Sequence, residues 1–190
     1  IGDPGMGAHH VVIRDNQVYD NRGINDGGGD AIDLGGRNDN MTHLLVDGNR
    51  LWGSNGLVKF SRTTKYAIMR RNQMTGGAFI DLYGPPYPSC SIYHNTVYNT
   101  RHGLEVGVGD VGGSAPLPRD VNWGGLQVRN NLFAFCGSYI LNIWTPMLNR
   151  KPDSIGLDGN LYRLADGAPG QGHLDEWWAE SPEAPRVVTE

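Results

Sequence analysis

Apolar and polar residues along this chain follow one short pattern that recurs: an apolar residue, two variable positions, an asparagine, one variable position and another apolar residue. The pattern occurs six times, at Ile13-Asn16-Val18, Val46-Asn49-Leu51, Met69-Asn72-Met74, Ile92-Asn95-Val97, Val128-Asn131-Phe133 and Leu157-Asn160-Tyr162. The asparagines lie 33, 23, 23, 36 and 29 positions apart, so a unit of about 23 residues recurs with insertions. Repetition at such a period is typical of a solenoid, in which each unit forms one coil.

Each asparagine is expected at a corner, where the chain bends sharply between two short strands. Asparagine tolerates left-handed backbone angles, and its amide hydrogen-bonds nearby backbone groups. In stacked coils these amides can also bond one another, which satisfies polar groups that would otherwise be buried at a cost. Five positions after each asparagine stands a small residue, which suits a second tight corner: Asn21, Ser54, Gly77, Thr100, Cys136 and Ala165.

A further strand with an apolar, polar, apolar alternation follows in the first five units: Ile32-Asp33-Leu34, Val58-Lys59-Phe60, Ile80-Asp81-Leu82, Leu104-Glu105-Val106 and Leu141-Asn142-Ile143. Because side chains alternate between the two faces of a strand, the middle residue of each should point outward. Stacked strands lie about 4.8 Å apart, so these residues should form an outward column about 20 Å long. The column consists of Asp33, Lys59, Asp81, Glu105 and Asn142.

These repeats resemble the right-handed parallel β-helix of the pectate-lyase-like superfamily, over roughly Val11 to Tyr162. The resemblance implies an all-β solenoid of about six coils with asparagine-lined corners. Leucine-rich repeats also have asparagine corners, but they show several leucines per unit and a helix-length connection, which this sequence lacks. The superfamily includes lyases, hydrolases, epimerases and non-enzymatic adhesins, so the resemblance indicates the fold more strongly than the activity.

The 190 residues are expected to form one domain. Residues 1–164 would form the coils, with loop insertions at 21–30 and 107–125, and residues 165–190 a C-terminal cap and tail. A short helix over 173–180 would bring Trp177 and Trp178 over the open end of the stack. The first coil starts within about ten residues of Ile1 without a capping helix, so we expect further coils upstream.

Charge and hydropathy exclude some classes of function. The net charge of −4 and the pI near 5.8 argue against a nucleic-acid surface. No run of 18 apolar residues occurs, so we expect no membrane span. Cys90 and Cys136 fall at different places in the repeat, which predicts buried free thiols rather than a disulfide. The resemblance implies a secreted or periplasmic protein, and we expect a monomer.

The outward column carries the candidate chemistry. Polar residues are normal at outward strand positions, and alternating charges keep stacked side chains from repelling one another, so the column can be a plain solvated surface. Two features favour a site. A proline-rich loop at 83–88 and the insertion at 107–125 both leave the chain beside this column, and long loops often carry function. In addition, carboxylates on adjacent rungs supply the oxygen ligands that calcium prefers.

Resemblance to calcium-dependent polysaccharide lyases implies β-elimination on an acidic, uronic-acid-containing polysaccharide. In that reaction the ion would stabilise an enolate-like intermediate, and its ligands would be Asp33, Asp81 and Glu105. Lys59 would be the base, because a lysine beside a metal ion and a cationic neighbour can lose its proton near neutral pH. The residues that would bind substrate carboxylates or protonate the leaving oxygen are Arg62, Arg101 and His102. Further substrate-binding candidates are Tyr83, Trp52, Asn142 and Trp144.

Two alternatives remain open. A glycoside hydrolase needs two carboxyl groups at a set distance, and Asp81 and Glu105 on neighbouring rungs would lie about 5 Å apart, which is the retaining distance. The paired-aspartate and Gly-His-Gly signatures of pectin hydrolases are missing. A non-enzymatic carbohydrate-binding or surface β-helix would instead use an aromatic stripe, whose rings can stack on sugars or pack against one another. The stripe consists of Tyr19, Trp52, Thr75 and Tyr98.

A second outward column stands two positions before the asparagines. It mixes charges as a solvated surface would, and it consists of Arg14, Asp47, Arg70, Tyr93, Arg129 and Asp158.

Overall fold

The computed structural model describes residues 9–21, 29–34, 41–61, 64–77, 80–83, 89–107, 125–137, 139–144 and 156–164. At positions 61, 81, 83, 105–107, 139–144 and 164 it describes the backbone without the side chain. Arg62, most of the two predicted insertions and the predicted C-terminal cap therefore lie outside the described residues.

The described part of the chain is all β, and it contains no helix. Its strands form three parallel sheets. Sheet 1 contains β1 (Val12–Arg14), β4 (Leu45–Asp47), β7 (Ile68–Arg70), β10 (Ser91–Tyr93), β13 (Gln127–Arg129) and β16 (Gly156–Asp158). Sheet 2 contains β2 (Gln17–Tyr19), β5 (Arg50–Trp52), β8 (Gln73–Thr75), β11 (Thr96–Tyr98), β14 (Leu132–Cys136) and β17 (Leu161–Leu164). Sheet 3 contains β3 (Ile32–Leu34), β6 (Val58–Ser61), β9 (Ile80–Tyr83), β12 (His102–Gly107) and β15 (Tyr139–Trp144).

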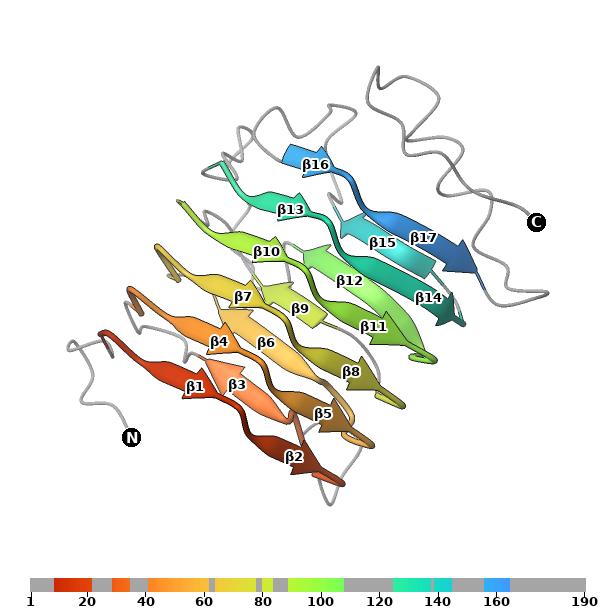
Figure 1. Cartoon of the computed structure of the whole chain (residues 1–190), viewed down its shortest axis with the longest axis horizontal. Helices are drawn as coiled ribbons and strands as arrows, with labels where there is room; N and C mark the ends of the chain where they lie inside the picture. The colour runs from red at the N-terminus through yellow and green to blue at the C-terminus, as the bar shows by residue number, and fades with distance from the viewer. Residues whose placement is uncertain are drawn as a thin grey trace, which may run out of the picture.

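The order of strands is the same in all three sheets. Each strand pairs with the strand three places before it and the strand three places after it in the chain. The chain therefore visits sheets 1, 2 and 3 in turn and moves one rung further with each circuit, as in a parallel β-helix (Figure 1). The sequence prediction of stacked parallel strands is confirmed.

The asparagine corner joins sheet 1 to sheet 2, and its mechanism is only partly the predicted one. The amides do bond one another: each Nδ2 donates to the Oδ1 of the next asparagine, from Asn16 to Asn160, at 2.9 to 3.1 Å. Left-handed backbone angles, however, belong to the residue before each asparagine. These residues are Asp15, Gly48, Arg71, His94, Asn130 and Gly159. The asparagine is therefore selected by its amide, and the preceding residue makes the bend.

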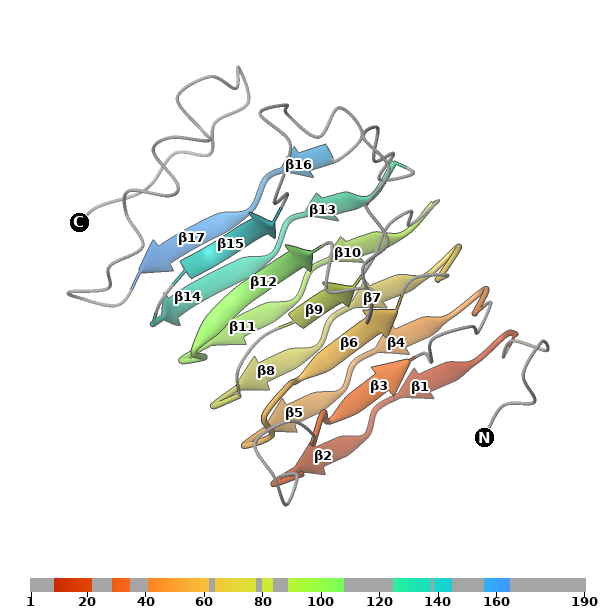
Figure 2. The ribbon, with the colours of Figure 1, turned by 180° about the vertical axis from the view of Figure 1, so that it is seen from behind.

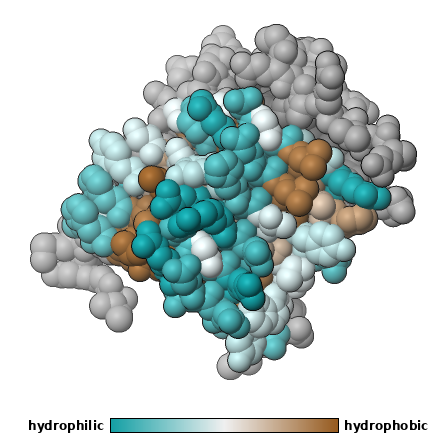
Figure 3. All heavy atoms as spheres, in the orientation of Figure 1, coloured by the Kyte–Doolittle hydropathy of each residue, from teal (hydrophilic) through white to brown (hydrophobic). Residues whose placement is uncertain are grey.

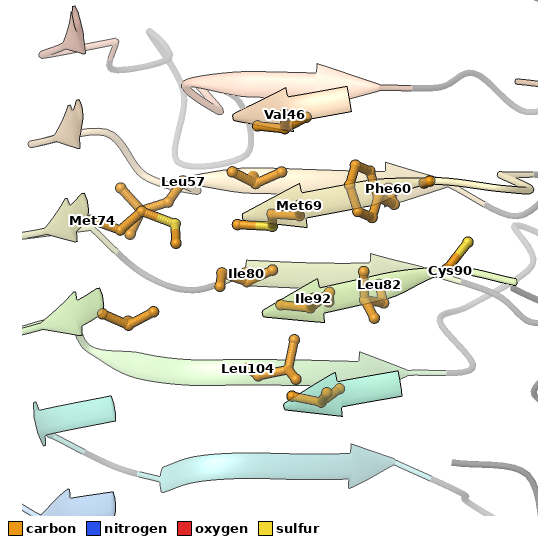
Figure 4. Close-up of a cluster of buried hydrophobic side chains, with 14 of the residues drawn as sticks. Val46, Leu57, Phe60, Met69, Met74, Ile80, Leu82, Cys90, Ile92 and Leu104 are labelled. Atoms are coloured by element: carbon orange, nitrogen blue, oxygen red, sulfur yellow. The ribbon is translucent and has the colours of Figure 1, made fainter. Parts of the chain in front are cut away.

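Between the three sheets lies an apolar core in which like positions stack on one another. Val46, Met69 and Ile92 follow one another beneath sheet 1, and Ile80 and Leu104 face them from sheet 3 (Figure 4). These side chains are at most 1% exposed. Each apolar side chain packs against its equivalents in the coils above and below. This packing stabilises the stack, because the removal of apolar area from water is the main favourable contribution to folding.

The second corner, after sheet 2, has the small residues that the repeat predicts. Ser54 and Thr100 are buried there, and Cys136 is buried at the end of β14, directly before the corner. At Gly77 an added Cβ would lie 2.5 Å from Cδ2 of Leu57 and 2.9 Å from the carbonyl oxygen of Ser54, so this position has no room for a side chain.

Both cysteines are free and buried, as predicted. Burial raises the pKa of the Cys90 thiol to about 11 and also raises the pKa of Cys136. Neither thiol is therefore suited to act as a nucleophile near neutral pH. No helix in the described ranges has the length and apolar character that a membrane span requires.

Candidate functional site

The middle residues of the strands of sheet 3 have the predicted backbone register. Asp33 is the Cα partner of Lys59, Lys59 of Asp81, Asp81 of Glu105, and Glu105 of Asn142. Figure 2 turns this sheet toward the reader, with β3, β6, β9, β12 and β15 side by side. Five residues from five different coils therefore share one line across the sheet, at intervals of about 4.8 Å.

Lys59 sits between two carboxylates at the β3 end of this column. Its Nζ lies 3.8 Å from Oδ2 of Asp33 and 3.9 Å from Oδ2 of Asp30. All three side chains are partly open to solvent. Partial burial raises the pKa of Asp33, Lys59 lowers it, and Asp30 raises it further, with a net upward shift. Both ion pairs are long and partly open to solvent, so each contributes only a weak attraction to the ammonium group.

Asp30 is a site residue that the sequence patterns missed. It lies at the end of the 21–30 insertion, three positions before Asp33, and its equivalent in the next coil is Gly56. Asn21 donates from Nδ2 to the carbonyl oxygen of Asp30 at 2.6 Å, and the Asp30 carboxylate lies directly over Gly56. A Cβ at Gly56 would stand 1.9 Å from Oδ1 of Asp30. The signal that could have found Asp30 is this glycine, whose missing side chain leaves space for the carboxylate.

The register limits how a calcium ion could be held. Lys59 stands between Asp33 and Asp81, so an ion bound by both acids would have to take the place of the lysine's ammonium group. Asp81 and Glu105 are direct backbone partners on adjacent rungs, and carboxylates are among the oxygen ligands that calcium prefers. Their donor chemistry fits calcium. No group of three histidine, cysteine, aspartate or glutamate side chains gathers as a metal site among the described residues, which exclude the side chains of Asp81 and Glu105.

His102 lies in the same sheet as Lys59 but two rungs away from it, and Arg101 directly precedes the strand of His102. His102 begins β12, three positions before Glu105, and β9 separates β12 from the strand of Lys59. Its imidazole is half-buried, and burial followed by the charge of Arg101 lowers its pKa. Arg101 is exposed. A ligand that touched these residues and Lys59 together would have to extend across β9.

The aromatic candidates divide between two sheets. Tyr83 and Trp144 are both backbone partners of Gly107, two positions beyond the column of sheet 3. Trp52 belongs to sheet 2, on a different face from Lys59. Its ring stacks on Tyr19 with the centroids 4.7 Å apart and the planes 8° from parallel. The two rings cover each other's faces, which favours the packing interpretation of this end of the stripe.

Comparisons with protein-family models, with curated proteins and with solved structures found no match for this chain. The site is therefore interpreted from its own geometry and chemistry.

Proposed function

We propose that this protein is a carbohydrate-active β-helix that cleaves a uronic-acid-containing polysaccharide by β-elimination on the outward face of sheet 3. We further propose that its coils are right-handed and that the fold belongs to the pectate-lyase-like superfamily. The observation that carries the proposal is the register of Asp33, Lys59, Asp81, Glu105 and Asn142. A line of polar groups at regular intervals suits an extended polymer, because successive sugars can meet successive rungs.

Lys59 has the central part in the proposed reaction. β-Elimination removes the hydrogen next to the uronate carboxylate and then expels the oxygen of the glycosidic bond. The neutral amine of Lys59, formed when its ammonium group gives a proton to solvent, would take that proton beside Asp30 and Asp33, whose Oδ2 atoms lie 3.9 and 3.8 Å from Nζ. Arg101 and His102 would bind a carboxylate of the neighbouring sugar or protonate the leaving oxygen. The partly exposed position of His102 at the start of β12 supports the second role.

The charge of the column explains why a cation belongs in the proposal. Three carboxylates stand in the column against one lysine, so an acidic polymer would be repelled unless a cation offsets them. Asp81 and Glu105 would hold a calcium ion, and Asp33 would remain the partner of Lys59. When bound, the ion would neutralise the substrate carboxylate and so make the adjacent hydrogen more acidic. Tyr83, Asn142 and Trp144 would contact sugars further along the sheet.

Hydrolysis is the second candidate, and one observation favours it. Asp81 and Glu105 are direct Cα partners, and residues on adjacent rungs lie about 5 Å apart, close to the carboxyl spacing of retaining glycosidases. The two acids would then be nucleophile and general acid.

The test is an assay of polygalacturonate, alginate and glycosaminoglycans with added calcium. A new ultraviolet absorbance from unsaturated uronate would support elimination. Reducing ends without that absorbance would show hydrolysis and overturn the elimination proposal. If neither product forms while the polymer binds, the protein is a non-catalytic binding module.

A further inference from the structure

A second group of charged residues gathers on sheet 1, on a different face from the Lys59 column. Asp47 belongs to the outward column of β4, where a solvated carboxylate was expected, yet its side chain is 0% exposed. Three arginines bury it. The Nη2 atoms of Arg14, Arg70 and Arg71 lie 3.2, 3.2 and 2.6 Å from Oδ2 of Asp47. The expectation of a solvated mixture of charges is therefore wrong at this rung.

The carboxylate fixes the guanidinium groups in place. Arg71 binds it with two parallel hydrogen bonds, Nε to Oδ1 at 2.7 Å and Nη2 to Oδ2 at 2.6 Å. Arg70 also donates from Nη1 to the hydroxyl oxygen of Tyr93 at 3.2 Å. The hydrogen bonds that Arg71 and Arg70 donate to Asp47 hold the pKa of this carboxyl well below its usual range, so it stays ionised. The arginines are thus oriented in advance, and a ligand would bind with little loss of side-chain entropy.

The cluster has more N–H donors than the Asp47 carboxylate can accept. Each guanidinium carries five N–H donors, and one carboxylate accepts about four hydrogen bonds. The Nε of Arg70 is buried without an acceptor in the described part of the chain. Arg14 and Arg71 remain 47% and 59% exposed, so their outer N–H groups face solvent. Asp15, which follows β1, lies near Arg71. Three arginines against Asp15 and Asp47 leave an excess of one positive charge, in a chain whose net charge is −4.

The surroundings of the cluster suit an extended sugar polymer. Arg14, Arg70 and Arg129 occupy every second rung of this column, at intervals of about 10 Å. Beside them Val12, Leu45 and Ile68 form a partly exposed apolar row in register. Figure 3 views the side of the molecule that Figure 1 shows, where a broad hydrophilic area adjoins small apolar patches. Guanidinium groups that alternate with apolar surface can bind the oxyanions and the ring faces of acidic sugars together.

We propose that sheet 1 is a second binding site, at which Arg14, Arg70 and Arg71, held by Asp47, bind the carboxylate or sulfate groups of an acidic polysaccharide. The choice of ligand rests on the proposed function, whereas the site itself rests on the arginine cluster. A chain bound to sheet 1 would hold the polymer on the protein while another stretch enters the column of sheet 3.

The test measures binding by calorimetry in the Lys59→Ala background, so that sheet 3 contributes little. The probes are a hexagalacturonate, a sulfated glycosaminoglycan hexasaccharide and the neutral maltohexaose. We expect one or both acidic probes to bind, with an affinity that falls with added salt, and the neutral probe not to bind. The acidic probe that binds identifies the oxyanion. Arg71→Gln should weaken its binding about tenfold, as the loss of one charge-assisted hydrogen bond predicts.

Two further variants complete the design. Arg14→Gln leaves the bidentate pair of Arg71 with Asp47 in place, so it should fold normally and still weaken binding severalfold; circular dichroism checks the fold. Arg50→Gln, on sheet 2, is the matched control and should bind like the parent. Equal affinity in the parent, Arg14→Gln and Arg71→Gln, or no binding of either acidic probe, would overturn the proposal. Intact binding by a protein without lyase activity would overturn the proposed function alone.

Discussion

Lys59 and Asp33 are direct partners in neighbouring strands, and the Nζ of the lysine lies 3.8 Å from Oδ2 of the aspartate. They come from different coils, so the contact exists only because β3 and β6 stack in phase. Asp30 approaches the same ammonium group from the preceding corner. The pairing makes Lys59 the best-defined candidate side chain of sheet 3, and the first two predictions concern it.

Replacing the lysine should remove catalysis and spare the fold. We expect Lys59→Ala to lower elimination by about 10²- to 10⁴-fold, the usual contribution of a general base. The free energy of unfolding should change by less than about 1 kcal/mol, because the two ion pairs of Lys59 are long and partly exposed. Unsaturated uronate is measured by absorbance and stability by urea unfolding. Lys65→Ala is the control, since Lys65 lies outside the column. Full turnover by Lys59→Ala would remove the lysine from the mechanism.

Gly56→Ala should disturb the same lysine indirectly. The new Cβ would occupy the place of the Asp30 carboxylate, which must then move away from Lys59. We expect kcat to rise severalfold, because the lysine loses one of the two carboxylates that favour its ammonium form. The urea midpoint should change little, because only the end of one side chain has to shift. Gly137→Ala is the matched control: its Cβ would meet the carbonyl oxygen of Arg101 at an ordinary 3.5 Å. An unchanged kcat together with a lower urea midpoint would show that Gly56 has a purely structural role.

The asparagine ladder should be most sensitive in its middle. Asn72 accepts hydrogen bonds from the backbone and side-chain nitrogens of Asn49, and it donates to Asn95 and to the carbonyl oxygen of Val46. Asn72→Ala leaves several of these buried groups unsatisfied, which should cost about 2–4 kcal/mol in urea unfolding. Asn16→Ala, at the exposed end of the ladder, should cost less than about 1 kcal/mol. Equal losses at the two positions would contradict this explanation.

The arginine cluster should make stability depend on acid pH. The pKa of Asp47 is lower in the folded protein than in the unfolded chain, so its ion pairs contribute their full stability above about pH 4. That contribution is lost progressively as the pH falls from there toward the folded pKa. The unfolding free energy should therefore drop more between pH 7 and pH 3 in the parent than in Asp47→Asn.

At pH 7 the Asp47→Asn variant should itself be less stable by about 1–3 kcal/mol, because three guanidinium groups lose their shared partner and water replaces it only in part. Asp158→Asn, an exposed position of the same column, is the control and should keep the acid response of the parent. Identical pH profiles for the parent and Asp47→Asn would show that Asp47 does not govern acid stability.

The sequence by itself determined the parallel stacking and the register of the Lys59 column. The asparagine pattern marks the corner in every coil, and the strict alternation in Val58-Lys59-Phe60 and its equivalents leaves one phase in which the apolar residues face inward. A slip of one residue would bury Lys59, so the hydrophobic effect alone selects the register. The buried state of the two free cysteines follows from the same periodicity.

Only the tertiary structure decided which side chains meet across the rungs. Asp30 reaches Lys59 from an insertion that the repeat does not describe, and Arg71 turns back from a left-handed corner to cover Asp47. Both contacts depend on the direction in which a corner residue projects and on the absence of a side chain at a position such as Gly56. The sequence repeat shows only at which positions a residue type recurs. Lateral contacts also depend on side-chain conformations and local backbone angles, which are determined once the coils are stacked.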